Sequence, residues 1–292
     1  MAATDHDQPH QNDTPLPGDG LDAAQMPGHW LLARLGKRVL RPGGVELTRW
    51  MLDTLELRPD DRVVELAAGL GATARLALAR RPAVYTAVDR DGAAVTHLGA
   101  LAGPGRTEVR AVRADAADTG LPDGSATVVY GEAMLTMQPD PAKRRIVREA
   151  HRLLAGSSGR YAVHELCLLP DGLDPELADR ITADLRDAIH VGVRPLTPAD
   201  WSELLAEEGF TVTARKTAPM ALLEPRRLVA DEGLVRALGI GGRVLRDLAA
   251  RRRVLEMRRV FRHHQAHLGA VALIATPVRR SPDKEAPTCP PQ

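Results

Sequence analysis

Short apolar runs alternate with amphipathic stretches along most of the chain. Each run is bounded by turn-forming residues, which is typical of strands, and the stretches between the runs carry apolar residues at helical spacing. The strands expected on this basis are 62–66, 84–89, 108–112, 126–130, 160–164, 210–217 and 270–275, and clear helices are expected at 46–57, 171–190 and 197–208. Regular alternation of strand and helix predicts an α/β fold built on a largely parallel sheet.

The first expected strand runs directly into a glycine turn. Glu65 lies near the end of that strand, Gly69 and Gly71 follow it, and a helical pattern begins at about Ala74. Glycine tolerates a positive φ and lets a ligand approach the backbone closely. The turn also brings that ligand to the unpaired N–H groups at the start of a helix. The pattern therefore predicts a bound cofactor with polar edges.

An acidic residue follows the second expected strand. Asp89 lies about 20 positions beyond the glycines, where a carboxylate in a βαβ unit accepts hydrogen bonds from ribose hydroxyls. Residues 69–74 read Gly-Leu-Gly-Ala-Thr-Ala and satisfy the GxGxxA form of the dinucleotide-binding motif. An NAD(P)-dependent oxidoreductase is therefore one interpretation of this segment.

A second interpretation rests on Glu65. The pattern Glu65-x-Ala67-x-Gly69-x-Gly71 resembles motif I of the class I S-adenosylmethionine (SAM) dependent methyltransferases, usually (E/D)xGxGxG, with Ala67 in place of the first glycine. Further segments resemble the small-molecule, type 11 branch of that family: 113–116, 132–135, 140–141, Glu149 and 152–154. The resemblance implies a Rossmann-like doubly wound sheet of about seven strands. Helices would cover both faces, and the last strand would run antiparallel between strands five and six.

The same resemblance implies SAM as the cofactor and assigns the residues around it. Glu65, Ala67, Gly69 and Gly71 would hold the methionine moiety, Asp89 the ribose, Asp115 and Ala116 the adenine, and Arg90 would flank the nucleoside. Glu132 would hold the SAM amino group, orient an amine or cap the next helix. Asp89 and Asp115 have a second interpretation as helix caps. Their joint position after successive strands favours the cofactor site, because such strand ends face one crevice.

Methyl transfer depends mainly on orientation and electrostatics, and it needs a base only when the acceptor must lose a proton. His164 and Glu165, at the end of the fifth expected strand, are the candidates for a base or for orienting the substrate. A structural histidine at a strand end is the alternative.

Four further residues are candidates for contacting the methyl acceptor: Trp30, Met134, Met137 and His190. Trp30 and residues 41–44 belong to an N-terminal segment that forms either part of a lid or a helix packed on the sheet edge. The two methionines line an apolar pocket or fill the core. His190 ends a helix expected over the substrate side.

Charge and composition narrow the choice of partner. The chain has 39 basic and 38 acidic residues, a net charge of +1, which argues against a dedicated nucleic-acid binder. Arginine largely replaces lysine, so the runs 251–253 and 258–259 predict a basic outer helix face, with phosphate or anionic lipid binding as the alternative.

Two cysteines, Cys167 and Cys289, are too few for a disulfide framework and favour a cytoplasmic setting. His263 and His267 share a helical face without further ligands, so no metal site is expected.

The chain is expected to hold one domain with two extensions. Residues 1–27 and 279–292 are rich in Pro and polar residues and predict disordered tails. The domain itself, 28–278, would include an N-terminal helical cap at 28–57 and a helical insertion at 225–267. No stretch has the roughly 20 apolar residues of a membrane span.

We therefore expect a SAM-dependent methyltransferase acting on a small molecule. An NAD(P)-dependent oxidoreductase, a non-catalytic SAM-binding protein and an RNA methyltransferase are the alternatives. The acceptor atom and the oligomeric state stay open.

Overall fold

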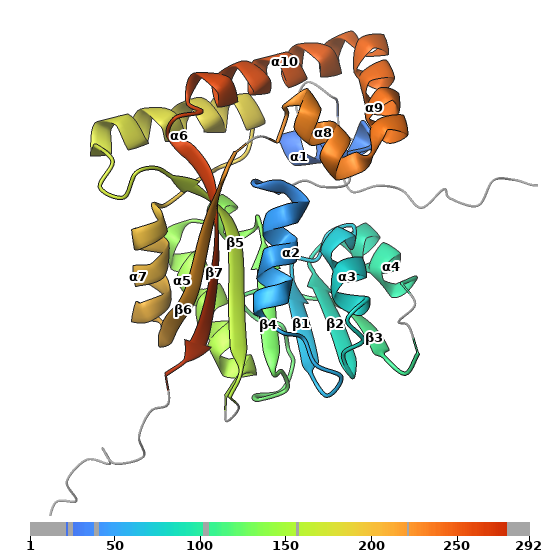
Figure 1. The fold of residues 1–292 in the computed structure, drawn as a ribbon, viewed down its shortest axis with the longest axis vertical. Coiled ribbons are helices and arrows are strands. Elements are labelled where there is room, and N and C mark those ends of the chain that lie inside the picture. The colour runs from blue at the N-terminus through green and yellow to red at the C-terminus, as the bar shows by residue number, and fades with distance from the viewer. Residues whose placement is uncertain are drawn as a thin grey trace, which may run out of the picture.

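Seven strands form a single sheet at the centre of the molecule (Figure 1). The computed structural model describes residues 22, 26–37, 41–101, 105–155, 158–220 and 222–278. The strands are β1 (Arg62–Leu66), β2 (Val84–Asp89), β3 (Glu108–Arg113), β4 (Val128–Glu132), β5 (Arg160–Leu168), β6 (Phe210–Pro219) and β7 (Leu268–Pro277). Their spatial order is β3-β2-β1-β4-β5-β7-β6. Strand β7 runs antiparallel between β5 and β6, so the expected Rossmann-like sheet with a reversed last strand is confirmed.

Helices cover both faces of the sheet because its central strands are apolar on both sides. On one face α2 (Gly44–Thr54), α3 (Ala72–Leu78) and α4 (Gly92–Gly99) pack through residues such as Met51, Ala74 and Leu98. On the other, α5 (Asp140–Leu153) and α7 (Pro198–Glu207) pack through Val147 and Trp201. Thr197 caps α7 in a capping box with Asp200.

A second group of helices lies beyond the carboxyl ends of the parallel strands, at the top of Figure 1. It consists of α1 (Gly28–Arg34), α6 (Pro175–Ile189), α8 (Pro225–Glu232), α9 (Leu234–Arg246) and α10 (Leu248–His263), and we call it the roof. Apolar side chains of α1, α6 and α10, among them Leu31, Leu185 and Met257, share one buried cluster. The roof therefore stands directly above the strand ends where ligands bind in such sheets.

The fifth strand is longer than its sequence predicts, and this changes the place of two candidate residues. We expected it to end at His164, but β5 continues to Leu168 because it pairs with β7 from Tyr161 through Leu168. His164 and Glu165 consequently lie in the interior of β5 and not at its carboxyl end. Other boundaries shift by a few residues: β4 begins at Val128, and α1 ends at Arg34.

The predicted tails fall mostly outside the described residues. Of residues 1–27 only 22, 26 and 27 are described, and Met26 is fully buried in the cluster beneath the roof. The predicted tail at 279–292 lies wholly outside the described residues. Within the described part of the chain, no helix combines the length and apolar character required to cross a membrane.

Candidate functional site

The turn between β1 and α3 is shaped by three residues with left-handed backbone: Ala67 (φ 54°), Gly69 (φ 54°) and Gly71 (φ 70°). A Cβ added at Gly69 would meet no atom within 4 Å, whereas one at Gly71 would meet Leu101 at 3.0 Å. Open space above Gly69 is what a bound cofactor needs. Ala67 does more than add a methyl group to the motif, because a left-handed backbone costs a residue with a Cβ about 1–2 kcal/mol.

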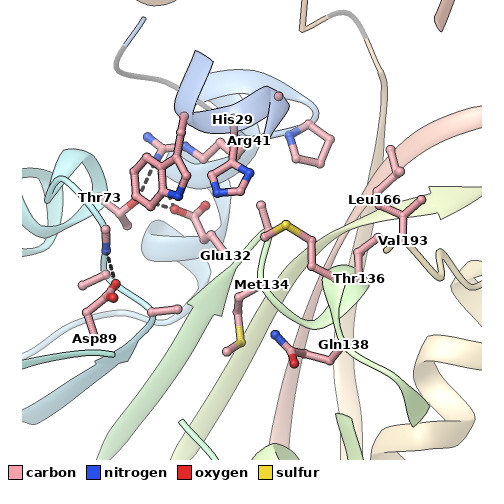
Figure 2. Close-up of a pocket in the computed structure, with 18 of the residues that line it drawn as sticks. His29, Arg41, Thr73, Asp89, Glu132, Met134, Thr136, Gln138, Leu166 and Val193 are labelled. Carbon is pink, nitrogen blue, oxygen red and sulfur yellow. Dashed lines mark hydrogen bonds and ion pairs between the residues drawn. The ribbon is translucent and has the colours of Figure 1, made fainter. Parts of the chain in front are cut away.

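A cavity of about 330 Å³ lies between this turn and the roof (Figure 2). Its polar half is lined by eight of the nine expected cofactor residues: Glu65, Ala67, Gly69, Asp89, Arg90, Asp115, Ala116 and Glu132. The ninth, Gly71, shapes the turn without lining the cavity. The carboxyl ends of the first four strands thus bring these residues together around one space, although they are spread over 68 positions of the sequence.

Asp89 holds the glycine turn and still has capacity for a ligand. Its Oδ2 accepts a hydrogen bond from the N–H of Gly69 at 2.9 Å, and its Oδ1 accepts one from the N–H of Asp91 at 2.9 Å. A carboxylate oxygen has two lone pairs, so each can accept a further hydrogen bond. The helix-cap interpretation fits Asp91, whose side chain accepts from Ala93 and Ala94 at the start of α4. Asp115 is exposed, and its Oδ1 accepts from the N–H of Ala117.

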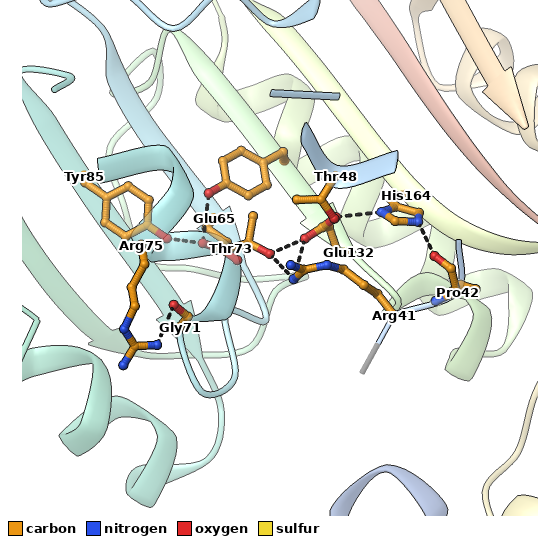
Figure 3. Close-up of polar contacts among 11 residues, drawn as sticks. Arg41, Pro42, Thr48, Glu65, Gly71, Thr73, Arg75, Tyr85, Glu132 and His164 are labelled. Atoms are coloured by element: carbon orange, nitrogen blue, oxygen red, sulfur yellow. Dashed lines mark hydrogen bonds and ion pairs between the residues drawn. The ribbon is translucent and has the colours of Figure 1, made fainter. Parts of the chain in front are cut away.

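Glu65 is a buried carboxyl group in a largely uncharged setting. Its Oε2 accepts hydrogen bonds from the hydroxyls of Tyr85 and Tyr130 (Figure 3). Burial raises the pKa of Glu65 to about 8, against the opposing effect of the Tyr85 hydrogen bond, and the charge of Glu132 raises it further. The group is therefore mostly protonated at neutral pH. A cation placed beside it in the cavity would favour its ionised form.

Glu132 is the hub of a buried polar network (Figure 3). Its Oε1 accepts hydrogen bonds from Thr48 Oγ1 and His164 Nδ1, both at 2.6 Å. Its Oε2 accepts from Thr73 Oγ1 and lies 3.2 Å from Arg41 Nη1. Burial alone would raise the pKa of Glu132, but Arg41, His164 and Thr48 outweigh it and lower the value to about 2. Glu132 is thus a fixed anion that ties β4 to α2, α3 and the segment before α2.

His164 lies wholly inside this network. While Nδ1 faces Glu132, Nε2 contacts the backbone oxygen of Pro42 at 2.6 Å, and the side chain is fully buried. Both ring nitrogens are thus occupied by contacts with protein oxygens. Neither nitrogen faces a substrate, because His164 does not line the cavity.

Glu165 holds the short loop after β4. Its two oxygens accept hydrogen bonds from the backbone N–H groups of Met134, Leu135 and Thr136 and from the Thr136 hydroxyl, at 2.7–3.0 Å. The carboxyl group is fully buried, burial raises its pKa, and it does not line the cavity. The sequence-based candidates for a base are therefore both engaged in holding the structure.

Three of the four candidate acceptor contacts line the cavity: Trp30, Met134 and Met137. The fourth, His190, does not. It ends α6 with a left-handed backbone, at φ 53°, and its side chain is exposed, while its neighbour Ile189 lines the cavity. The apolar half of the cavity is completed by Leu166, Leu185, Val193, Met220, Leu222, Met257 and Phe261.

Two cavity residues have properties that the sequence analysis did not single out. His29 enters the cavity from α1 (Figure 2), and burial together with the charge of Arg90 lowers its pKa to about 4, so its imidazole is neutral at pH 7. Arg41 is buried, and its Nε has no hydrogen-bond partner among the described residues. The available signal was their position in the sequence: His29 is next to Trp30, and Arg41 begins 41–44, the two parts of the segment that the lid interpretation places at the active site.

The histidines of 263–267 do not gather into a metal site. His264 Nε2 lies 2.7 Å from Asp184, and His267 Nδ1 lies 2.9 Å from the backbone oxygen of Leu169. Over the described ranges, no three His, Cys, Asp or Glu side chains cluster in a way that would hold a metal ion.

Comparison with known proteins gives one family match and several structural neighbours. Residues 63–157 match a family described as a methyltransferase domain. An uncharacterized protein of Haemophilus influenzae is 31% identical over 252 residues, which cover 84% of this chain and 96% of that protein. The matched segment runs from β1 to just beyond α5, the part of the chain that carries most of the polar half of the cavity.

Two of the solved structures that share the fold have different activities in their names. The [4+2]-cyclase SpnF has a TM-score of 0.63 at 16% identity, over 85% of this chain and 93% of its own. A geranyl diphosphate methyltransferase in complex with GPP and sinefungin has a TM-score of 0.55 at 13% identity, over 80% of this chain and 78% of its own. At these identities the likeness concerns the fold.

Proposed function

Because this chain belongs to the class I SAM-dependent methyltransferases, we propose that its methyl acceptor is a small, largely apolar molecule bound beneath the roof. SAM is the cofactor of the family, and the polar half of the cavity fits it. Gly69 leaves open space, Asp89 can accept further hydrogen bonds, and Arg41 keeps a buried N–H group without a partner. These are the groups that a nucleoside and an amino-acid carboxylate require.

The observation that carries the acceptor proposal is the continuity of the cavity. One space runs from Gly69 and Asp89 to Leu166 and Val193 (Figure 2), and α1, α6 and α10 cover it. Its volume and mixed lining are typical of small-molecule sites. The roof covers the strand ends, which supports a small acceptor over an RNA helix. RNA binding that weakens steeply with salt would favour the RNA alternative instead.

In this proposal the chain contributes binding, orientation and exclusion of water. When bound, SAM supplies a methyl group on a positively charged sulfur, so no covalent enzyme intermediate is needed. Glu65 would pair with the ammonium group of the methionine moiety, and Arg41 Nε would donate to its carboxylate. Glu132 acts through Arg41 and Thr73, holding both against the cofactor side of the cavity. The apolar roof keeps water away from the reacting groups.

We assign the role of base to His29, in place of His164 and Glu165. His29 lines the cavity, its side chain reaches the space between the polar and apolar halves (Figure 2), and its neutral imidazole has a nitrogen free to accept a proton. A positioned base contributes about 10²–10⁴-fold to a rate when the acceptor must lose a proton. An acceptor with a free lone pair would need His29 only for orientation.

The His29 assignment is tested by replacing His29 with Gln. We expect kcat to fall about 100-fold or more, while affinity for S-adenosylhomocysteine stays within about threefold, because the imidazole faces the acceptor. With a pKa of about 4, the wild-type rate should lose the contribution of His29 only as pH falls through about 4. An unchanged kcat in His29→Gln would remove the assignment, as would equal losses in kcat and cofactor affinity.

The pKa of Glu65 predicts how cofactor binding depends on pH. The carboxyl group is protonated below about pH 8 and must ionise to pair with an ammonium group. Binding therefore releases one proton, and affinity for S-adenosylhomocysteine should rise by about tenfold per pH unit from pH 6 towards pH 8. Calorimetric titration in two buffers of different ionisation enthalpy measures this release. Glu65→Gln should bind more weakly and without the slope; a slope retained in that variant would contradict the pairing.

The function itself is tested by binding and then by turnover. Calorimetric titration with S-adenosylhomocysteine, with NAD(H) in parallel, should detect the former alone. Since a [4+2]-cyclase shares this fold, binding must be followed by an acceptor screen that measures release of S-adenosylhomocysteine from SAM. NAD(H) binding would favour the oxidoreductase alternative. Binding of S-adenosylhomocysteine, with no acceptor that releases it from SAM, would favour a non-catalytic role.

The two cysteines, of which Cys167 is buried and unpaired, support a cytoplasmic setting for this reaction.

A further inference from the structure

Exposed apolar side chains gather on one part of the roof. Among the described residues, eight large apolar side chains are exposed, and seven of them belong to α8, α9 and α10: Val229, Leu234, Val235, Leu238, Leu245, Leu248 and Leu255. Val235 is 87% exposed, and Leu238 and Leu248 are each 67% exposed. We call these seven side chains and the exposed arginines between them the outer roof face. Apolar clusters of this kind on an outer surface mark interaction sites.

On α10, the outer roof face is the reverse side of a helix that also lines the cavity. Helix α10 buries Ala250, Arg253, Met257 and Phe261, and the last two line the cavity. Its exposed residues Leu248, Arg252, Leu255 and Arg259 recur at spacings of four, three and four, which places them on a single opposite face. Helix α9 does not line the cavity, but it too has one buried side, with Ala237 and Ile240, and one exposed side, with Leu234, Leu238 and Leu245.

Positive charge is concentrated in the same segment. Residues 225–263 hold eleven arginines and four acidic residues, although the whole chain has a net charge of only +1. Arg251, Arg252 and Arg259 are exposed and form no ion pair with any part of the chain that the structure describes. Figure 1 shows α10 as the outermost helix at the top of the molecule, with α9 beside it. The outer roof face therefore combines exposed apolar side chains with exposed arginines that form no ion pair among the described residues.

This combination distinguishes between possible partners. A second copy of the chain, packed through the same face, would bring the exposed arginines of both copies together. A nucleic acid would satisfy the arginines but would leave exposed leucines against phosphates. An anionic bilayer satisfies both groups, because arginines lie among the headgroups while leucines enter the boundary with the acyl chains.

We propose that the outer roof face docks this protein onto the surface of an anionic lipid membrane. Docking places the inner side of α10, with Met257 and Phe261, one helix away from the bilayer. If the proposed function holds, this geometry suits an apolar acceptor that is dissolved in the membrane. That part of the inference rests on the proposed function. Lipid binding itself requires neither the cofactor nor the acceptor.

The test is sedimentation of the purified full-length protein with lipid vesicles. We expect binding to vesicles that contain phosphatidylglycerol, little binding to vesicles of phosphatidylcholine alone, and weaker binding at high salt. Replacing Arg251, Arg252 and Arg259 with Glu should reduce binding by about 100-fold or more, because each arginine near an anionic surface contributes about fivefold. Replacing Leu238, Leu248 and Leu255 with Gln should reduce it without changing the net charge.

Two matched controls separate the face from general charge and hydrophobicity. The Arg49→Glu, Arg106→Glu and Arg145→Glu triple variant has the same net charge as the first variant, at exposed positions outside the roof. Val278→Gln removes the one exposed large apolar side chain described outside α8–α10. Both should bind vesicles like the wild type. All variants should retain S-adenosylhomocysteine binding, which shows that they are folded and separates this test from that of the methyltransferase site.

Several results would overturn the proposal. Equal binding to vesicles with and without phosphatidylglycerol would do so, as would binding that survives both roof variants. A dimer in light scattering that the leucine variant converts to a monomer would assign the face to self-association. RNA binding that is lost in the arginine variant but not in the leucine variant would assign it to nucleic acid.

Discussion

Replacing Asp89 with Ala should abolish most cofactor binding while leaving the protein folded. Asp89 is positioned by Gly69 and by Asp91 and is proposed to accept the two ribose hydroxyls of the cofactor. Hydrogen bonds to a charged group contribute about 1.5–3 kcal/mol each. Losing two of them should weaken S-adenosylhomocysteine binding by about 10²–10⁴-fold. Calorimetric titration measures the change directly.

Asp91 provides the matched control for this experiment. It lies two residues further on and caps α4 through Ala93 and Ala94, without lining the cavity. Asp91→Ala should therefore cost about 1 kcal/mol of stability, as lost caps do, and leave cofactor affinity almost unchanged. If Asp89→Ala bound S-adenosylhomocysteine as tightly as the wild type, the ribose assignment would be wrong. Similar affinity losses in both variants would indicate a disturbed β2–α4 connection.

Replacing Glu165 with Ala should destabilise the whole domain. The variant leaves three backbone N–H groups and the Thr136 hydroxyl without their acceptor in a fully buried place. Each unsatisfied buried donor costs about 1–3 kcal/mol, so the free energy of unfolding should fall by about 4 kcal/mol or more. Urea denaturation measures the loss. This loss in the free energy of unfolding is comparable to the total free energy of unfolding of many domains.

Glu203 is the control for Glu165. It is exposed on α7, so Glu203→Ala should change the free energy of unfolding by less than about 0.5 kcal/mol. The experiment also separates the two interpretations of Glu165. A Glu165→Ala variant with wild-type stability and a large loss of kcat would restore the sequence-based prediction that Glu165 acts in catalysis.

The parts of the site that the sequence predicts depend on local order along the chain. Glu65 and Asp89 lie at the ends of strands and Gly69 follows one within a few residues, and parallel strands bring their carboxyl ends to one edge. The fold and the cofactor-binding half of the cavity could be predicted from the sequence for this reason. The order of the sheet followed from the resemblance to a known family, because no local pattern specifies where β7 inserts.

The remaining features depend on contacts between distant segments. His164 and Glu165 were both expected at the end of the fifth strand, but β5 continues to Leu168. Glu165 can be buried within the sheet because residues 134–136, about thirty positions earlier in the chain, donate hydrogen bonds to its carboxyl group. His29 gave no signal of its own, because its neutral state arises from burial and from Arg90, 61 positions away. Hydrogen bonds and charge interactions between residues so far apart in the chain cannot be predicted from a short stretch of sequence.

The insertion of β7 between β5 and β6 has a consequence for how the chain is completed during synthesis. β6 has no place in the sheet until β7 has paired with β5, and α8–α10 lie between β6 and β7 in the sequence. The parallel half, β1 to β5, can therefore assemble on the ribosome first. Addition of the last strand then completes the sheet and brings both ends of the α8–α10 segment to their final positions in one step. A chain that stopped before Leu268 would keep its glycine turn but would leave the β5 edge open to other strands.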